Sequence, residues 1–210
     1  MKQINQFINE YIIKKKLDKP IDSENHFEYH PKTKQDLFDN INELVENNIY
    51  DFNCIDTSEI TDMSDLFYDS KFEETNIDVS EWDVSNVKNM KGMFKDCENF
   101  NCDLSNWNVS NVKYMQFMFD NCTDFEGKGL EKWSLDNAEY MSNMFEYCEN
   151  FDCDVSNWKM SKAETIKYMF SYCVNFTGKG LNKWKLTPET EINKALDHCN
   201  INKLPSWYKT

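Results

Sequence analysis

The chain has 210 residues, of which 40% are hydrophobic and 15% aromatic, so it has enough apolar material to bury a core and is not a disordered chain. Its net charge is −14, and all 23 basic residues are lysines. An acidic chain without arginine lacks the side chain preferred for bidentate phosphate and guanine contacts, which argues against direct nucleic-acid binding.

The distribution of apolar residues does not predict a signal peptide or a membrane span. Residues 1–19 hold no apolar run long enough for a signal peptide, and no stretch approaches the roughly 20 apolar residues of a membrane span. The eight cysteines would indicate a disulfide scaffold in a short secreted chain, but this chain has an ample core. We therefore expect reduced thiols, a cytoplasmic location in a bacterium or a phage-infected host, and no association with a membrane.

Two amphipathic helices are predicted before the repeats begin. Apolar side chains recur at helical spacing in residues 3–16, and again from Leu37 to Val45. Residues 19–32, which contain two prolines, indicate a linker between them. The first helix could bind a membrane, but packing is the favoured interpretation. Because stacked repeats must cover the open end of their core, residues 1–50 are predicted to be an N-terminal helical cap region and residues 51–210 the repeat domain.

The repeat domain is recognised by columns of residues that return every 25 or 26 residues. Almost the same sequence as that from Cys97 to Tyr147 is found again from Cys148 onward. One column consists of Trp82, Trp107, Trp133, Trp158, Trp184 and Trp207. Another consists of Phe67, Phe94, Phe119, Phe145, Phe170 and Leu196. Short repeats bury their apolar faces only by stacking, so these columns predict six coils with the large apolar side chains inside.

Each coil is predicted to contain one strand and one short helix. Val87, Met90 and Phe94 recur at the spacing of one helical face. A residue able to cap the first helical turn precedes this segment in every coil. These residues are Ser58, Ser85, Ser110, Asp136, Ser161 and Thr187. The preceding segment, such as 100–104, alternates between apolar and polar residues, which is typical of a strand.

One coil, from Trp82 to Phe100, reads W-D-V-S-N-V-K-N-M-K-G-M-F-K-D-C-E-N-F. This motif resembles the repeat of the BspA-like leucine-rich-repeat family of bacterial surface and related proteins, and the resemblance extends over about residues 51–210. It implies an α/β fold, a leucine-rich-repeat-like solenoid of about six strand-helix coils with an N-terminal helical cap. It also implies a role in adhesion or protein recognition, without catalytic residues.

The cysteines are better explained by stacking than by metal binding. Cys97 and Cys102, like Cys148 and Cys153, are separated by four residues, and no coil supplies a histidine nearby. A column of small residues follows the phenylalanine column by three positions. It consists of Ser70, Cys97, Cys122, Cys148, Cys173 and Cys199. We predict a structural ladder of thiols and no metal site.

No catalytic residues are predicted either. His198 and Cys199 are adjacent, so on a helix they cannot face each other as a base and a nucleophile must. His26 and His30 lie in the predicted linker, which makes them weak candidates for ligands. The segments 127–129 and 178–180 read Gly-Lys-Gly and lack the spacing of a phosphate-binding loop. They indicate tight turns, and we expect a protein that is not an enzyme and needs no cofactor.

A polar strip on the predicted strand side is the candidate binding site. It consists of Asp78, Asn101, Asp103, Lys128, Asp152, Asp154 and Lys179. A structural alternative is a charge ladder that avoids like charges on neighbouring coils. Because rim charges affect association more than folding, the replacement of Asp103 and Asp154 by lysine is predicted to weaken a partner with little change in melting temperature.

Two functions fit this sequence. The first is a non-catalytic intracellular module that binds another protein through its repeat surface, since a rigid surface loses little conformational entropy on binding. The alternative is an acidic DNA mimic that inhibits a nucleic-acid-binding protein. A mimic requires carboxylates in a stripe at phosphate-like spacing, whereas many carboxylates here alternate with lysines.

Overall fold

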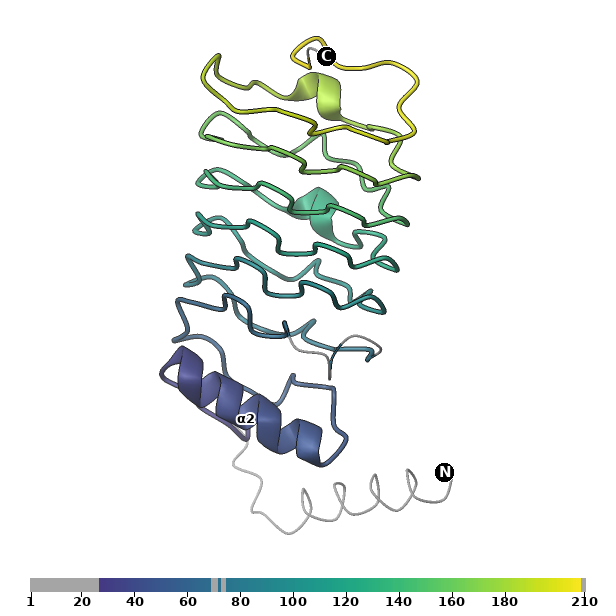
Figure 1. Cartoon of the computed structure of the whole chain (residues 1–210). Helices are drawn as coiled ribbons and strands as arrows, with labels where there is room; N and C mark the ends of the chain where they lie inside the picture. The colour runs from purple at the N-terminus through teal and green to yellow at the C-terminus, as the bar shows by residue number, and fades with distance from the viewer. Residues whose placement is uncertain (1–26, 69–71, 73–74, 209–210) are drawn as a thin grey trace.

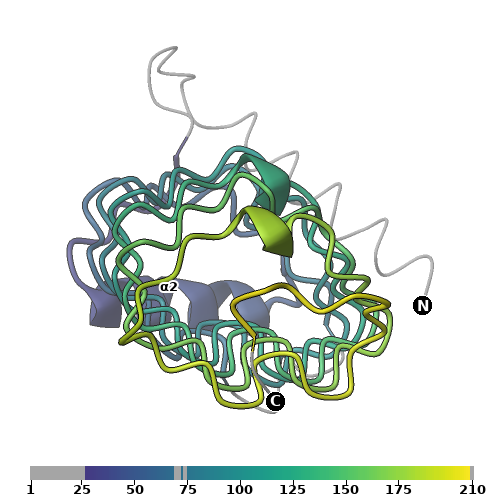
Figure 2. The same ribbon diagram turned by 90° about the horizontal axis from the view of Figure 1, so that it is seen from above.

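The computed structural model describes residues 27–68, 72 and 75–208. Within them the chain forms a stack of coils, each lying on the one before it (Figure 1). Helix α2, Lys34–Glu46, lies across the N-terminal end of this stack. Seen along the stack, successive coils follow nearly the same outline (Figure 2). The helix predicted over residues 3–16 lies outside the described residues.

The second predicted helix is confirmed by α2. The side chain of Thr33 accepts a hydrogen bond from the backbone N–H of Asp36 at 3.1 Å, and the Asp36 carboxylate accepts one from the N–H of Thr33 at 3.0 Å. These reciprocal bonds form a capping box, which satisfies free donors at the helix start. Leu37, Ile41 and Leu44 are buried on one face of α2 and belong to the same core as the coils.

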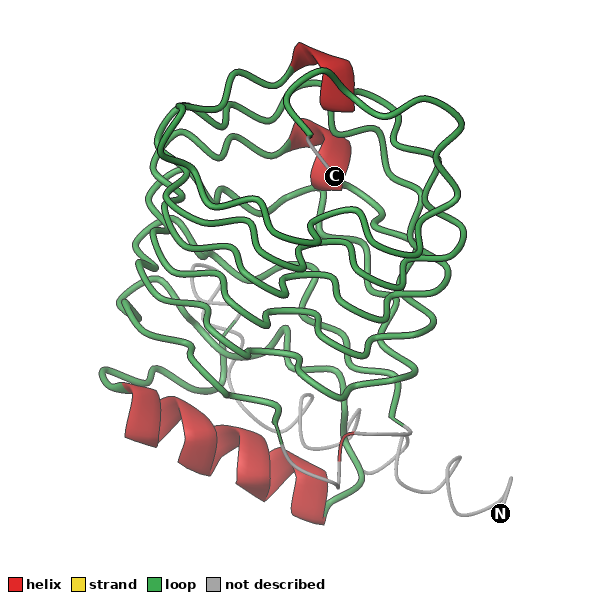
Figure 3. Cartoon of the chain, turned by 45° about the horizontal axis from the view of Figure 1, so that its top comes forward, coloured by secondary structure: helices red, strands yellow, loops and turns green. Residues whose placement is uncertain are grey.

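The predicted fold class, an α/β solenoid of strand-helix coils, is wrong. The described part of the chain contains one α-helix, α2, and two 3-10 helices, η2 (Leu130–Lys132) and η3 (Leu181–Lys183). The same residues contain no strand, and most of the chain is turn or irregular coil (Figure 3). The coils are connected by isolated parallel bridges, which link in succession Asp62, Asn89, Tyr114, Tyr140, Thr165 and Glu191.

We call the segments that carry these bridges the rungs. They are residues 62–68, 89–96, 114–121, 140–147, 165–172 and 191–198. At alternate positions, the backbone N–H of one rung donates to a carbonyl of the next. Met90 donates to Tyr114 at 2.8 Å and Phe94 donates to Met118 at 2.9 Å, and equivalent bonds join the later rungs. Corresponding residues of successive rungs therefore lie directly above one another.

The rungs replace the predicted short helices because each contains residues with left-handed backbone angles. Their first left-handed position is occupied by Asp65, Gly92, Phe117, Asn143, Tyr168 and Lys194, with φ between +51° and +61°. An α-helix of L-residues cannot include such a residue. Tight turns on either side, such as the bond from Met93 N to Met90 O at 3.2 Å, still direct Met90, Met93 and Phe94 inward. Helical spacing of apolar residues thus arises without a helix.

The predicted helix caps also have a different role. The backbone N–H of Ser85 donates to Asp83 Oδ1 at 2.9 Å, and that of Ser110 donates to Asn108 Oδ1 at 3.2 Å. In these turns the acceptor is the Asp or Asn side chain two residues earlier, rather than the serine hydroxyl. The cap prediction is wrong here because no helix follows the serine.

The interior confirms the predicted columns. Each tryptophan of its column donates an indole N–H to a backbone carbonyl of the preceding coil, as Trp107 does to Val79 at 3.0 Å. The rings of Phe94 and Phe119 are fully buried and stack at 5.5 Å, and this stacking continues along the phenylalanine column. Each coil therefore makes its core contacts and its buried hydrogen bonds with its immediate neighbours.

The thiol column is a structural ladder, as predicted. Cys122 Sγ donates to the carbonyl of Phe94 at 3.0 Å, and Cys148 Sγ donates to that of Phe119 at 2.9 Å. Burial raises the pKa of both thiols well above the ordinary value, so they stay protonated and remain donors. None of the eight cysteines, which all lie within the described residues, forms a disulfide. Ser70, the first member of the predicted column, lies outside the described residues.

A substitution at Lys194 tests the local structure of the rungs. This exposed residue has a φ of +53°. In a helix, alanine is about 1 kcal/mol more stable than glycine, but at a left-handed position the order is reversed by about 1 kcal/mol. We therefore expect Lys194→Gly to unfold at a higher urea concentration than Lys194→Ala. Both variants lose the contact of the ammonium with the Tyr168 ring at 5.8 Å, so their difference reports the backbone. The opposite order would contradict the left-handed geometry.

Candidate partner-binding surfaces

The carboxylates of the polar strip hold turns in the backbone. Asp103 Oδ1 accepts a hydrogen bond from Ser105 N at 2.9 Å, and Asp154 Oδ1 accepts one from Ser156 N at 2.9 Å. Asp78 makes the same bond to the residue two positions later at 3.0 Å. Hydrogen bonds from Ser105 and Ser156 lower the pKa of Asp103 and Asp154, respectively. These side chains therefore have a structural role that the sequence interpretation did not include.

Other members of the strip connect neighbouring coils. Lys179 Nζ lies 3.3 Å from Asp154 Oδ2. Asp152 Oδ1 accepts hydrogen bonds from the backbone and the hydroxyl of Thr177 at 2.9 and 2.7 Å. The structure thus brings Lys179 and Asp154 together and directs them at each other, whereas Asp152 binds Thr177.

The same holds around Glu126. Its backbone N–H donates to Asn101 Oδ1 at 3.2 Å, and its carboxylate lies 3.3 Å from Lys128 Nζ. Polar groups of the strip are therefore engaged in contacts between or within coils. This arrangement favours the structural alternative, a ladder that keeps like charges apart.

A second surface, which the sequence analysis did not select, is rich in aromatic side chains. We call it the rung face, and it consists of the outward side chains of the rungs. Its aromatic members are Tyr68, Tyr114, Phe117, Tyr140, Tyr147, Tyr168, Tyr172 and His198. Tyrosine is enriched in the centres of protein interfaces, where it combines apolar area with a hydroxyl. The signal in the sequence was the return of tyrosine at the repeat interval, from Tyr114 to Tyr140 and from Tyr147 to Tyr172.

The rung face already binds a cation of its own chain. Lys95 Nζ lies 3.3 Å from Asp120 Oδ2, and it is 5.4 Å and 5.2 Å from the ring centroids of Tyr68 and Phe117. Burial raises the pKa of Asp120 to about 6, while the neighbouring ammonium acts in the opposite direction. Tyr68 on one side, and Phe117 with Asp120 on the other, thus form a site for an ammonium group between two rungs.

A second lysine repeats this arrangement. Lys113 Nζ lies 2.7 Å from Glu139 Oε2, and it is 5.5 Å and 5.8 Å from the ring centroids of Tyr114 and Tyr140. The two rings stack on each other at 5.3 Å. Combinations of rings and a carboxylate around a lysine ammonium therefore recur on this face and at its edge.

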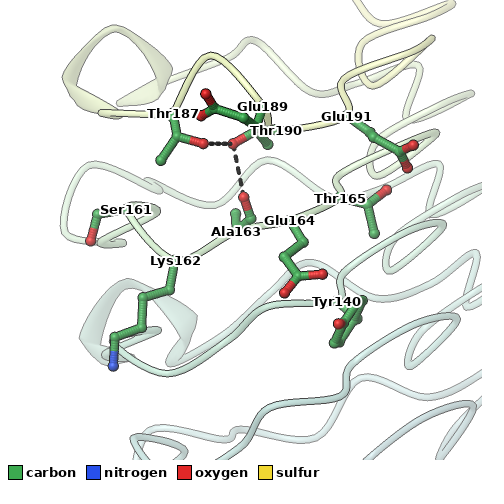
Figure 4. A pocket seen from close by; sticks show the side chains of 10 residues that line it. All are labelled: Tyr140, Ser161, Lys162, Ala163, Glu164, Thr165, Thr187, Glu189, Thr190 and Glu191. Atoms are coloured by element: carbon green, nitrogen blue, oxygen red, sulfur yellow. Dashed lines mark hydrogen bonds between the residues drawn. The ribbon is translucent and has the colours of Figure 1, made fainter.

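An open groove of about 570 Å³ lies beside the last rungs (Figure 4). Its lining consists of Tyr140, Ser161, Lys162, Ala163, Glu164, Thr165, Thr187, Glu189, Thr190 and Glu191. Thr190 Oγ1 donates to the carbonyl of Ala163 at 2.8 Å and lies 3.2 Å from the hydroxyl of Thr187, which joins two coils across the groove wall. With three glutamates and one lysine, the lining is acidic and suits a cationic group better than an anion.

The histidine and cysteine candidates have separate partners. His198 stacks on the Tyr172 ring at 4.3 Å, whereas the Cys199 thiol donates to the carbonyl of Phe170 at 3.0 Å. His30 lies 3.2 Å from a carboxylate oxygen of Asp56, and His26 is outside the described residues. Within the described ranges, no cluster of three or more histidine, cysteine or acidic side chains is arranged to hold a metal ion.

Comparison with known proteins identifies a family. A search of curated proteins and a search of solved structures each found no match. None of the helices in the described part of the chain combines the length and apolar character needed to cross a membrane. The model of the family described as "Mycoplasma protein of unknown function, DUF285" matches residues 32–139 and 121–207. These matches overlap and together include α2 and all of the rungs, and so the chain belongs to the DUF285 family.

Proposed function

We propose that this chain is a non-catalytic protein-interaction module that binds another protein through its repeat surface, with the rung face as the binding surface. The observation that carries the proposal is a pair of exposed, stacked tyrosines on this face. Tyr147 and Tyr172 are 42% and 38% exposed and stack on each other at 4.7 Å. Rings held by a rigid backbone ladder lose little rotamer entropy when a partner binds.

Two further observations support the proposal. The repeats resemble those of the BspA-like family, whose members take part in adhesion or protein recognition. Eight cysteines without a disulfide favour a reducing compartment, so we propose that the interaction takes place in the cytoplasm.

The pairing of charges on the rung face gives less support to a DNA mimic. A mimic presents carboxylates that are free to replace phosphates. Here Lys167 Nζ lies 2.8 Å from Glu191 Oε2, and Lys95 and Lys113 pair with acidic residues in the same way. The lysines interrupt the negative stripe that a basic groove would need.

Site-specific photo-crosslinking tests the proposal. Benzoylphenylalanine is placed at Tyr172 on the rung face, and in a matched variant at exposed Asp152 on the polar strip. Both variants are produced in cells of the organism that encodes the chain and are irradiated. We expect a defined crosslinked protein from position 172 and none from position 152, with the products identified by mass spectrometry.

Melting temperatures close to that of the parent establish that both variants are folded. Crosslinking from position 152 alone would place the partner on the polar strip and overturn the choice of surface. The lack of any crosslinked protein from either position would contradict the interaction function itself.

A further inference from the structure

One column of side chains on the rung face changes from polar to aromatic halfway along the stack. Its members, in chain order, are Asp96, Asn121, Tyr147, Tyr172 and His198. They are equivalent residues of successive rungs and share a φ between +57° and +61°. Backbone bonds of 2.8 Å from Asn121 N to Glu146 O and 2.9 Å from Tyr147 N to Ser171 O fix their register. Their side chains therefore leave the backbone in the same direction, one above the next.

The aromatic part of this column is a stack of three rings. Tyr147 stacks on Tyr172 at 4.7 Å with 11° between the planes, and Tyr172 stacks on His198 at 4.3 Å with 16°. Both faces of Tyr172 are thus covered by rings. Tyr147 is the last ring of the stack, and only its Tyr172 side has a ring partner among the described residues.

The next position in the column is too short to cover Tyr147. Asn121 occupies it, and its side-chain amide donates to Asp96 Oδ1 at 3.2 Å, toward the preceding rung. No lysine ammonium in the described part of the chain lies over the Tyr147 ring, in contrast to Tyr68 and Tyr114. The outer part of one ring face is therefore open to solvent, in agreement with the 42% exposure of Tyr147.

Acidic residues lie next to Tyr147 in the sequence and further along its column. Asp96 lies beyond Asn121 in the column, and Glu146 is the residue preceding Tyr147. Burial raises the pKa of Tyr147, and the negative charges of Glu146 and Asp120 raise it further, so both carboxylates act electrostatically on the tyrosine. An aromatic face beside carboxylates is the combination that holds Lys95 elsewhere on this surface.

We infer that the open face of Tyr147, together with the carboxylates of Asp96 and Glu146, binds a cationic side chain, lysine or arginine, of a partner protein. This inference rests on the proposed function and specifies the chemistry of the partner. A cation over a tyrosine ring is attracted by the ring's negative face, and nearby carboxylates strengthen the attraction. The net charge of −14 also favours the approach of a basic partner.

A labelled, acetylated peptide of six lysines is the probe for this site. Its affinity for the full chain is measured by fluorescence anisotropy at 50 and 150 mM salt. We expect Tyr147→Leu to bind the peptide about fivefold more weakly than the parent, because leucine keeps apolar area but has no ring face. The matched control is Phe27→Leu, which removes a ring that is 37% exposed and lies outside the rungs, and we expect its affinity to be unchanged.

A second variant removes charge without removing the hydrogen bond. Asp96→Asn keeps an acceptor for Asn121, and asparagine tolerates the left-handed angle of this position. We expect weaker peptide binding, with a larger loss at 50 mM than at 150 mM salt, because salt screens the interaction. Melting temperatures close to the parent value show that the variants remain folded.

Equal affinities of the parent and Tyr147→Leu would overturn the inference, because binding would then reflect the overall charge of the chain. Failure of the peptide to bind the parent would overturn it as well. If either result is obtained while position 172 still crosslinks a protein, the proposed function stands and only the cation site is lost. If the peptide depends on Tyr147 but no protein is crosslinked, the cation site stands without that function.

Discussion

Gly129→Ala should lower the free energy of unfolding by roughly 3 kcal/mol. Gly129 precedes η2 and has a φ of +87°, a region in which an L-residue is strained. An added Cβ would also lie 2.2 Å from the backbone nitrogen of Ser105 in the preceding coil. That backbone is held by the bond from Leu104 N to Lys128 O at 3.1 Å, so it cannot move aside without losing the bond. Strain and overpacking therefore add.

Gly92→Ala is the matched control. Its φ of +61° is also left-handed, but the nearest atom to an added Cβ is Oδ1 of the Asp65 side chain, which can rotate away. Equivalent positions in the other rungs hold residues other than glycine. We expect a loss of about 1 kcal/mol, measured for both variants by urea denaturation. Equal losses for the two variants would show that the approach to Ser105 is not a close backbone contact.

The polar strip yields the second large effect. The double replacement Asp103→Lys and Asp154→Lys should lower the free energy of unfolding by roughly 2 kcal/mol, since each site loses one hydrogen bond to a turn. For a chain of this size the melting temperature should fall by about 4 to 8 °C. This result differs from the sequence prediction of an almost unchanged melting temperature, because the turns were not foreseen.

Replacement of the same two residues by asparagine is the control, since the amide oxygen can still accept the turn hydrogen bond. We expect it to remain close to the parent in melting temperature. A loss as large as that of the lysine variant would mean that charge, rather than the turn, stabilises the strip.

The pH dependence separates the two contributions. The pKa of both carboxyls is lowered in the folded state, so their charged form stabilises the fold above the ordinary carboxyl pKa of about 4. This stability is lost as the pH falls through the lowered folded-state values. The small advantage of the parent over the asparagine variant should therefore be present at pH 7 and disappear in strong acid.

The core was predictable because every coil of the stack needs large apolar side chains at the same positions, so these residues recur at fixed intervals. Trp107 and Phe119 are buried where their columns place them, and α2 forms where apolar residues follow helical spacing. Local backbone structure was not predictable in the same way. Phe117 and Tyr168 adopt left-handed angles without glycine, so no residue type marks the turn, and tertiary hydrogen bonds determine the conformation.

Serine and aspartate residues did not distinguish a helix start from a turn, for a related reason. The pair Asp83 and Ser85 suits both a helix start and a turn closed by the aspartate, since both use a short polar side chain to bind a free N–H. The spacing of apolar residues favoured the helix. The turn is instead determined by the backbone hydrogen bonds between coils, which join residues far apart in the sequence.

The helix prediction explains why the sequence analysis did not select the rung face. On a helix, Tyr140 and Tyr147 would be two members of a varied solvated surface. On a ladder, each lies directly over or under its equivalent, so Tyr140 stacks on Tyr114 and Tyr147 on Tyr172. The repeat interval of the tyrosines was visible in the sequence, but its meaning depends on the register of the rungs.

The close approach of Gly129 to Ser105 is repeated by Gly180, whose added Cβ would lie 2.3 Å from the nitrogen of Ser156. Both glycines precede a 3-10 helix and face a coil without one, so the four coils that contain Trp107, Trp133, Trp158 and Trp184 alternate between two shapes. Duplication or deletion of a pair of coils leaves each junction between unlike neighbours, whereas loss of a single coil brings like shapes together. We therefore expect genes of this family to lengthen and shorten by whole pairs of coils, and the similar segments that begin at Cys97 and Cys148 each span one such pair.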